Sequence, residues 1–399
     1  MKKSNFSRLM CVFSLALLSL LSGVEAFSQI EGEDVVVARS IPFSSKLLNR
    51  NMNVQIRLPD GYGASDATYP VLYDMNGPFR ITFSYGTIEL LARSADIPDM
   101  IVVAVPPLPN GYVPAPYENR GDDPATADLS IAFLKEELIP FIEKNYRTNS
   151  FRILYGHSVG GLFTMYTLFN YPQLFTAYIA GSPWFQTNDQ YWLKHIEQMA
   201  AKKNLDGKFL FMTVGKEEAP LTIETYKELE QWMNSQTFKG LTWRSAWVDG
   251  DHGSMVGRNI YDGLIFIFKG WKIPNPLLLD ADVEAIDNQL KKSAAKWKKH
   301  GFEMSAIMPE QRLNAFGYAL INREEYDKAV KLFQYNVKLN PHSFNALDSL
   351  AEAYARKGDT ETAIKYYRMA IDLNPGDTDY AKRVLQNSKT KLRELGVKE

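Results

Sequence analysis

A serine set among glycines restricts this chain more than any other motif: residues 156–161 read GHSVGG. An apolar, β-prone run at 151–155 leads into it, and an apolar, helix-like run at 162–169 follows. Glycines on both sides of a serine let the backbone crowd around a strained residue and leave its hydroxyl exposed above a sheet. The pattern therefore predicts a strand, a sharp turn and a helix, with Ser158 as a nucleophile.

The rest of residues 33–270 alternates short β-branched runs with longer amphipathic ones. Strands are predicted at 35–37, 54–58, 71–73, 101–105, 153–155, 177–180, 209–214 and 243–248. Helices are predicted near 86–95, 127–146, 159–170, 189–203, 223–236 and 255–269. Several strands are apolar on both faces, as in a largely parallel sheet covered by helices on both sides. We predict an α/β domain over 27–272.

The first residues have the pattern of a cleaved secretory signal peptide over 1–26. Basic residues precede an apolar run at 9–21, and small residues stand at positions 24 and 26. The run is shorter than the ~20 residues of a membrane span, which disfavours an uncleaved anchor. The only cysteine, Cys11, lies in this segment. We expect a periplasmic or extracellular mature chain with no transmembrane span, no disulfide and no cysteine nucleophile.

After residue 276 the sequence becomes polar, helical and repetitive. A shift of 34 residues pairs Leu313 with Leu347 and Asn340-Pro341 with Asn374-Pro375. This period, with small residues at close-packed positions, resembles tetratricopeptide repeats. We predict a helical connector over 273–310, then two such repeats and a capping helix over 311–399. The repeats favour a protein partner or self-association, whereas the formal net charge of −1 argues against nucleic acid.

A serine hydroxyl needs a neighbouring base, usually a histidine that a carboxylate orients. The chain has five histidines. His157 lies inside the turn motif, where its position beside Ser158 aims it away from the hydroxyl. Three others lie in helical or repeat segments: His195, His300 and His342. His252 remains, on a short loop between a predicted strand and helix, and we predict that it is the base.

The acid is expected between serine and histidine in the chain, directly after a strand. The strand at 209–214 ends in Gly215-Lys216-Glu217-Glu218. We favour Glu218 as the acid and keep Glu217 as the alternative, since one of the two is expected to be a solvated surface charge.

Two backbone N–H groups should bind the developing oxyanion. Val159, the residue after the nucleophile, is expected to supply one. The loop after the strand at 71–73 should supply the other, from Gly77 or Phe79, because Pro78 has no N–H.

These residues resemble the esterase family of α/β-hydrolases that includes esterase D, enterochelin-type siderophore esterases, and feruloyl and acetyl xylan esterases. The similarity rests on YPVLY at 69–73, FLKEELIP at 133–140, GHSVGGLF at 156–163, SPW at 182–184 and DH at 251–252. It covers most of residues 45–270 and implies a serine ester hydrolase that needs neither a metal nor an organic cofactor. The helical region after 280 is similar to extensions on some bacterial members.

The chain departs from that family in its pocket. Asn76-Gly77-Pro78 stands where members often carry Asp-Gly-Asp, and a proline- and tyrosine-rich segment at 106–117 replaces one that often bears arginine and aspartate. The loss of arginines favours a neutral or aromatic ester over an anionic siderophore, although 106–117 could equally be a plain structural loop. Trp184 and Phe79 are candidate substrate contacts, and Trp184 could instead fill the core.

The leading hypothesis is a secreted serine carboxylesterase that acts on a small-molecule or polysaccharide-linked ester through a Ser158, His252 and Glu218 triad and an acyl-enzyme. Three alternatives remain open: an enterochelin-type siderophore esterase, an acyltransferase of the same fold, and a non-catalytic interaction protein that displays its repeats.

Overall fold

The computed structural model describes residues 36–60, 62, 67–77, 80–106, 108, 112–114, 127–200, 204–302, 307–376 and 378–397. The predicted signal peptide, Phe79 and most of segment 106–117 lie outside the described residues. No helix in the described ranges is long and apolar enough to cross a membrane.

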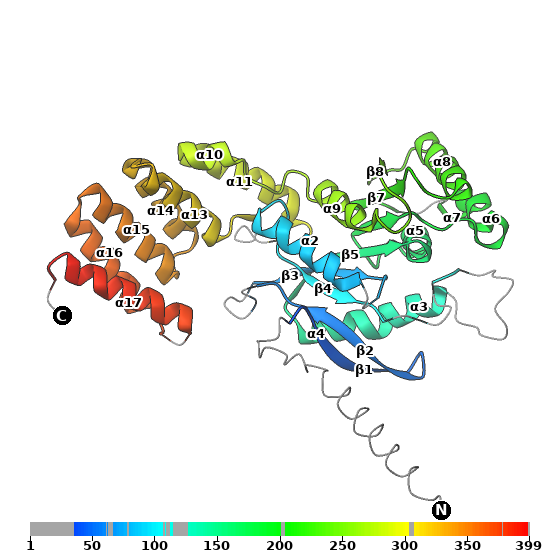
Figure 1. The fold of residues 1–399 in the computed structure, drawn as a ribbon, viewed down its shortest axis with the longest axis horizontal. Helices are drawn as coiled ribbons and strands as arrows, with labels where there is room; N and C mark the ends of the chain where they lie inside the picture. Colours follow the sequence, from blue (N-terminus) through cyan, green and yellow to red (C-terminus); the bar gives the residue numbers. More distant parts are fainter. Residues whose placement is uncertain are drawn as a thin grey trace, which may run out of the picture. The chain divides into compact units, whose positions relative to one another are not determined.

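An eight-stranded sheet forms the first part of the fold, in the order β1-β2-β4-β3-β5-β6-β7-β8 (Figure 1). Its strands are β1 (Arg39–Ser45), β2 (Arg50–Arg57), β3 (Tyr69–Asp74), β4 (Ile101–Ala104), β5 (Thr148–His157), β6 (Ala177–Gly181), β7 (Lys208–Gly215) and β8 (Leu241–Val248). β1 pairs with β2 and β2 with β4 in antiparallel fashion, and all other pairs are parallel. The predicted, largely parallel sheet is confirmed.

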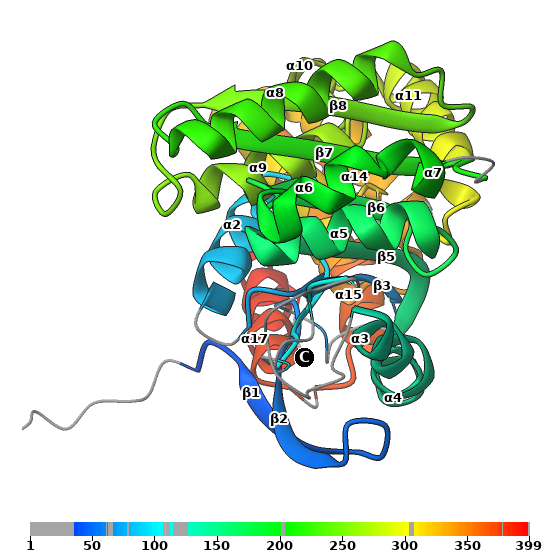
Figure 2. The same cartoon turned by 90° about the vertical axis from the view of Figure 1, so that its right-hand side faces the viewer.

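Helices cover both faces of this sheet. They are α2 (Ile81–Arg93), α3 (Ala127–Phe133), α4 (Ile139–Asn145), α5 (Val159–Asn170), α6 (Thr187–Lys194), α7 (Ile196–Ala200), α8 (Pro220–Ser235) and α9 (Val256–Ile267). Two hydrophobic cores result. One lies beneath α3, α4, α5 and α8, and the other beneath α2 and α9. Figure 2 shows these helices around the strands.

The first strand was predicted in the wrong place. Residues 36–38 have no regular structure, and β1 begins at Arg39. In its sequence, RSIPFSS, only alternate residues near the C-terminal end are buried. The strand also contains a proline, which an edge strand tolerates. Such a strand has too few apolar residues for periodicity to reveal it.

The single helix predicted over 127–146 is divided. A π-helical turn, η3 (Leu134–Leu138), separates α3 from α4. Pro140, near the start of α4, has no N–H, and its ring crowds the carbonyl four residues earlier. The backbone hydrogen bonds therefore take the wider i→i+5 spacing of a π-helix there. The helix predicted over 189–203 is likewise interrupted, at His195 between α6 and α7.

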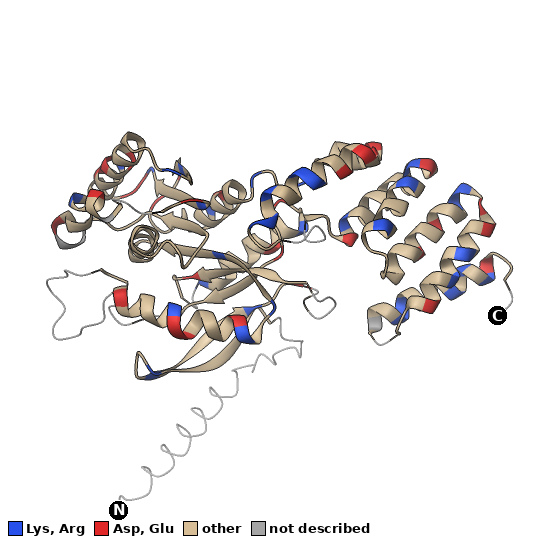
Figure 3. Ribbon diagram, turned by 180° about the vertical axis from the view of Figure 1, so that it is seen from behind, with Lys and Arg blue, Asp and Glu red and all other residues tan. Residues whose placement is uncertain are grey.

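The remaining helices are α10 (Asn275–Asp280), α11 (Val283–Lys298), α13 (Glu310–Asn322), α14 (Tyr326–Leu339), α15 (Phe344–Lys357), α16 (Thr360–Leu373) and α17 (Asp379–Glu394). Side chains of Asp282, Ser343, Asp359 and Thr378 cap the starts of four of them. The pairs α13–α14 and α15–α16 are the two predicted repeats. Residues of both charge signs lie on most of these helices (Figure 3).

The residues that follow the sheet share its hydrophobic core. Trp297 at the end of α11 packs on Phe151 of β5, with ring centroids 6.1 Å apart, and Phe302 lies 5.4 Å from the same ring. The hydroxyl of Ser150 also donates to the carbonyl of His300, at 3.2 Å. The segment after residue 272 therefore completes the core beneath β5.

Candidate active site

Ser158 joins β5 to α5 in a strained conformation, with φ 59° and ψ −120°. A positive φ in a residue other than glycine is uncommon and costs free energy, so the surrounding structure must enforce it. Two glycines make the turn sterically feasible. A Cβ on Gly156 would lie 2.1 Å from the carbonyl oxygen of Gly160, and one on Gly161 would lie 2.7 Å from that of Gly181. The predicted strand, turn and helix are present.

His252 lies on the loop between β8 and α9 and is bound to Glu218, on the loop after β7. Its Nδ1 is 2.8 Å from Oε2 and 3.0 Å from Oε1 of that carboxylate. The Glu218 side chain is 2% exposed and that of His252 46% exposed. An Nδ1–H that donates to Glu218 leaves the Nε2 lone pair free to accept a proton. The alternative acid, Glu217, is exposed and makes no such contact with His252.

One pocket of about 380 Å³ brings these residues together. The described residues that line it are Ser158, Trp184, Glu217, Glu218, Ala219, Thr222, Asp251, His252 and Gly253. Trp184 is half-buried, and its backbone N–H donates to the carbonyl of Ser158 at 3.0 Å. It thus lies at the pocket wall, where it was predicted as a substrate contact.

Three other histidines have different surroundings. His195 stacks on Tyr191 with ring centroids 4.0 Å apart, His300 packs on Phe151, and His342 is exposed between α14 and α15. None of the three is among the described residues that line the pocket.

Ser182, which the sequence did not single out as a site residue, holds the Glu218 carboxylate. It follows β6, is fully buried and has a positive φ of 43°. Its hydroxyl donates to Oε1 of Glu218. The carboxylate is therefore fixed by a hydroxyl as well as by the imidazole.

The loop after β3 lies against the nucleophile turn. Asn76 accepts a hydrogen bond from the backbone N–H of His157 at 3.0 Å, while its own N–H donates to Asp74 at 2.9 Å. The N–H of Met75 is bound to the carbonyl of Tyr155. Gly77, which has a φ of 76°, carries the next backbone N–H of this loop and is the predicted oxyanion donor. Phe79, the alternative, lies outside the described residues.

Val159 is the first residue of α5, so its N–H has no carbonyl partner within the helix. An N–H at this position can bind an anion that forms above Ser158, with support from the helix dipole.

Asp74 at the end of β3 supports the same loop and was also missed. It is fully buried, and burial raises its pKa, while hydrogen bonds from Ser84 and Asn76 lower it. An aspartate at the end of an apolar strand was visible in the sequence, but its partners were not.

A family model described as "Putative esterase" matches residues 45–255, more than half of the chain. The chain belongs to this esterase family. A tetratricopeptide repeat model matches residues 314–378 of the chain, a range that begins within α13 and ends after α16.

Curated relatives of this chain include the ferri-bacillibactin esterase BesA of Bacillus subtilis, which is 36% identical over 89 residues, or 22% of this chain and 31% of that protein. A siderophore enterobactin esterase of Emericella nidulans is 26% identical over 208 residues, or 44% of this chain and 65% of that protein. The chain therefore spans less than two thirds of the length of each.

Solved structures share the fold of this chain. An IroE-like serine hydrolase from Shewanella oneidensis aligns with a TM-score of 0.63 at 23% identity. The alignment covers 76% of this chain and 99% of that chain. An uncharacterised protein from Capnocytophaga ochracea aligns with a TM-score of 0.57 at 18% identity, over 88% of this chain and 99% of its own.

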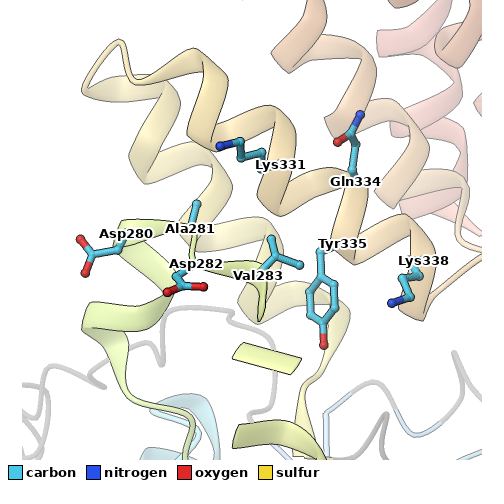
Figure 4. A pocket seen from close by; sticks show the side chains of 8 residues that line it. All are labelled: Asp280, Ala281, Asp282, Val283, Lys331, Gln334, Tyr335 and Lys338. Carbon is cyan, nitrogen blue, oxygen red and sulfur yellow. The ribbon is translucent and has the colours of Figure 1, made fainter. Parts of the chain in front are cut away.

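A larger hollow of about 620 Å³ contains none of the predicted site residues. It lies between the α10–α11 turn and α14, with Asp280 and Asp282 on one side and Lys331 and Lys338 on the other (Figure 4). Among the residues that the structure describes, no group of three or more His, Cys, Asp or Glu side chains is placed to hold a metal ion.

Proposed function

We propose that this chain is a serine carboxylesterase in which Ser158 is the nucleophile, His252 the general base and Glu218 the acid that orients it. One observation carries the proposal: His252 is bound to the buried Glu218 at 2.8 Å in the pocket that also contains the strained Ser158. A nucleophile, a base and an oriented carboxylate in one pocket are the parts that acyl transfer requires.

In the first half of the reaction, Oγ of Ser158 attacks the ester carbonyl as Nε2 of His252 takes the hydroxyl proton. The N–H groups of Val159 and Gly77 stabilise the oxyanion. The tetrahedral intermediate collapses, His252 gives the proton to the leaving alcohol, and the acyl group stays on Ser158. In the second half, His252 takes a proton from a water molecule as the water attacks the acyl-enzyme. The second tetrahedral intermediate collapses, His252 gives this proton to Oγ of Ser158, and the acid is released.

We infer a neutral or aromatic ester as substrate. The described pocket lining contains the carboxylates of Glu217, Glu218 and Asp251 and no lysine or arginine. Such a lining repels an anionic substrate, whereas the half-buried indole of Trp184 suits an apolar or aromatic group. We also propose that the predicted signal peptide directs the chain to the periplasm or outside the cell, and that the repeats bind a protein.

A siderophore ester is the second candidate, because one relative is a siderophore enterobactin esterase and another is a ferri-bacillibactin esterase. Polyanionic ferric siderophores are expected to bind poorly beside Glu217 and Asp251. A panel of feruloyl, acetyl-xylan, short-chain aryl and siderophore esters separates the candidates. The proposal predicts that kcat/KM is higher for the neutral and aromatic esters.

The activity itself is tested with p-nitrophenyl acetate and butyrate, with purified wild type and Ser158→Ala. We expect turnover by the wild type and only the background rate with Ser158→Ala, because the variant has no Oγ. Equal turnover by the two proteins would contradict the assignment.

A further inference from the structure

His157 is a buried titratable side chain to which the proposed mechanism gives no task. It directly precedes Ser158 and is only 5% exposed. From its sequence position, its ring was expected to point away from the nucleophile. In the structure it lies beside the ring of His252, with centroids 4.5 Å apart and the planes tilted by 48°.

Two hydrogen bonds fix His157, and a third fixes one of its partners. Its backbone N–H donates to Oδ1 of Asn76 at 3.0 Å. Its ring Nδ1 lies 3.2 Å from Nδ2 of Asn259, in α9. Oδ1 of Asn259 in turn accepts from the hydroxyl of Thr213 in β7, at 2.6 Å. The imidazole is therefore held by an amide whose own orientation is set from a neighbouring strand.

The backbone at Gly181 leaves room for the side chains of His157 and Asn259. A Cβ on Gly181 would lie 1.9 Å from Nδ2 of Asn259 and 3.1 Å from Nδ1 of His157. The first distance is far inside van der Waals contact, so any side chain at this position would displace the amide. β6 thus ends in a glycine where the amide and the imidazole meet.

These contacts define the protonation of His157. An amide N–H that donates to Nδ1 requires a lone pair there, so the proton of the neutral ring is on Nε2. Burial lowers the pKa of His157 to about 3, and the nearby His252 and Arg80 act in the same direction. A neutral ring beside His252 is compatible with the charge that His252 acquires during catalysis, whereas a cationic ring would oppose it.

We propose that His157 is a positioning residue: its neutral ring, held by Asn259 and Thr213, supports the imidazole of His252 in its bond to Glu218. The role rests on the proposed function, since it concerns how the base of that reaction is held. His157 is not among the described residues that line the pocket.

The first test compares wild type with His157→Ala on p-nitrophenyl butyrate. Loss of the supporting ring lets His252 move, and misplacement of a catalytic group by about 1 Å can cost about 100-fold in rate. We expect kcat to fall by about that factor with KM nearly unchanged, because the pocket wall is intact. A kcat within about twofold of wild type would overturn the proposal.

A matched pair of double variants separates ring support from loss of the hydrogen bond. His157→Phe with Asn259→Leu keeps a ring and leaves no unpaired amide, whereas His157→Ala with Asn259→Leu removes the ring. Replacement of both partners by apolar groups of similar shape can be nearly neutral. We expect the double variant that keeps a ring to have most of the wild-type kcat, and the double variant without a ring to have a low kcat. Equal kcat in the two pairs would contradict ring support.

The protonation state is measured by ¹⁵N NMR of histidine-labelled wild type, with the His157 signals assigned by their loss in His157→Phe. We expect a neutral ring with the proton on Nε2 from pH 8 to pH 5. Titration of His157 within that range would overturn the proposal. Turnover by the wild type decides the proposed function independently, so failure of the two can be told apart.

Discussion

At the scale of single residues, Glu217 and Glu218 are neighbours in the chain but have different surroundings. We predict that Glu218→Gln lowers kcat/KM about 10²- to 10⁴-fold, because an amide can donate to Nδ1 of His252 and place the proton on Nε2, where the base needs a lone pair. Measurement of kcat/KM on p-nitrophenyl butyrate checks this.

The matched control is Glu217→Gln. This side chain is exposed and has no contact with His252, so we expect kcat/KM within about twofold of wild type. If the two variants lost activity equally, or if Glu217→Gln were the worse, Glu218 would not be the acid.

The sequence singled out Ser158 and His252 as candidates, because a local motif and a position between strand and helix mark them. It favoured Glu218 over Glu217 but could not decide, because adjacent residues differ only in the direction of their side chains. Ser182 and Asn259 were missed because their partners lie 36 and 102 residues away in the chain. Such contacts exist only once the sheet has formed.

At the scale of elements, Asp348 links α15 to α17. It accepts hydrogen bonds from Ser388 and Asn387, yet burial raises its pKa to about 6. The folded state therefore holds this proton more tightly than the unfolded state, and stability falls as the pH rises from about 4 to 6. A shift of about two pKa units corresponds to about 3 kcal/mol.

We predict that wild type loses about 1–3 kcal/mol more than Asp348→Asn between pH 4 and pH 7, because the variant cannot ionise. Urea unfolding of both proteins at the two pH values measures the difference, with the variant as the control for all other titrating groups. Parallel changes in the two proteins would show that Asp348 is not the group responsible.

Apolar periodicity predicted most strands and helices. Each element that it missed has an identifiable physical reason. β1 is a polar edge strand, and its low apolar content hides it. The run 127–146 has unbroken helical periodicity, so the π-helical turn before Pro140 could not be located from amphipathicity alone.

At the scale of the whole molecule, the core beneath β5 extends past the predicted domain boundary at residue 272. Trp297 is fully buried against Phe151 and Phe268, and Phe302 packs on both of these rings. Removal of a buried tryptophan side chain alone costs about 3–5 kcal/mol, a large part of the stability of a typical domain.

We therefore predict that a chain that ends at residue 272 aggregates or unfolds, whereas one that ends at residue 308 stays soluble and hydrolyses p-nitrophenyl butyrate. The shorter chain exposes Phe151 and Phe268, and the longer one keeps α11 and Phe302. Gel filtration and thermal unfolding of the two chains compare them. A soluble, active chain that ends at 272 would place the boundary where the sequence first suggested it.

The most direct measurement is the covalent reaction of the nucleophile. Wild type and Ser158→Ala are treated with a fluorophosphonate, digested and analysed by mass spectrometry for the modified peptide. We expect one adduct on Ser158 in the wild type, formed in proportion to the loss of esterase activity. We expect no adduct in the variant. A wild type that keeps Ser158 unmodified while it hydrolyses ester, or a variant labelled as fast as the wild type, would contradict Ser158 as the nucleophile.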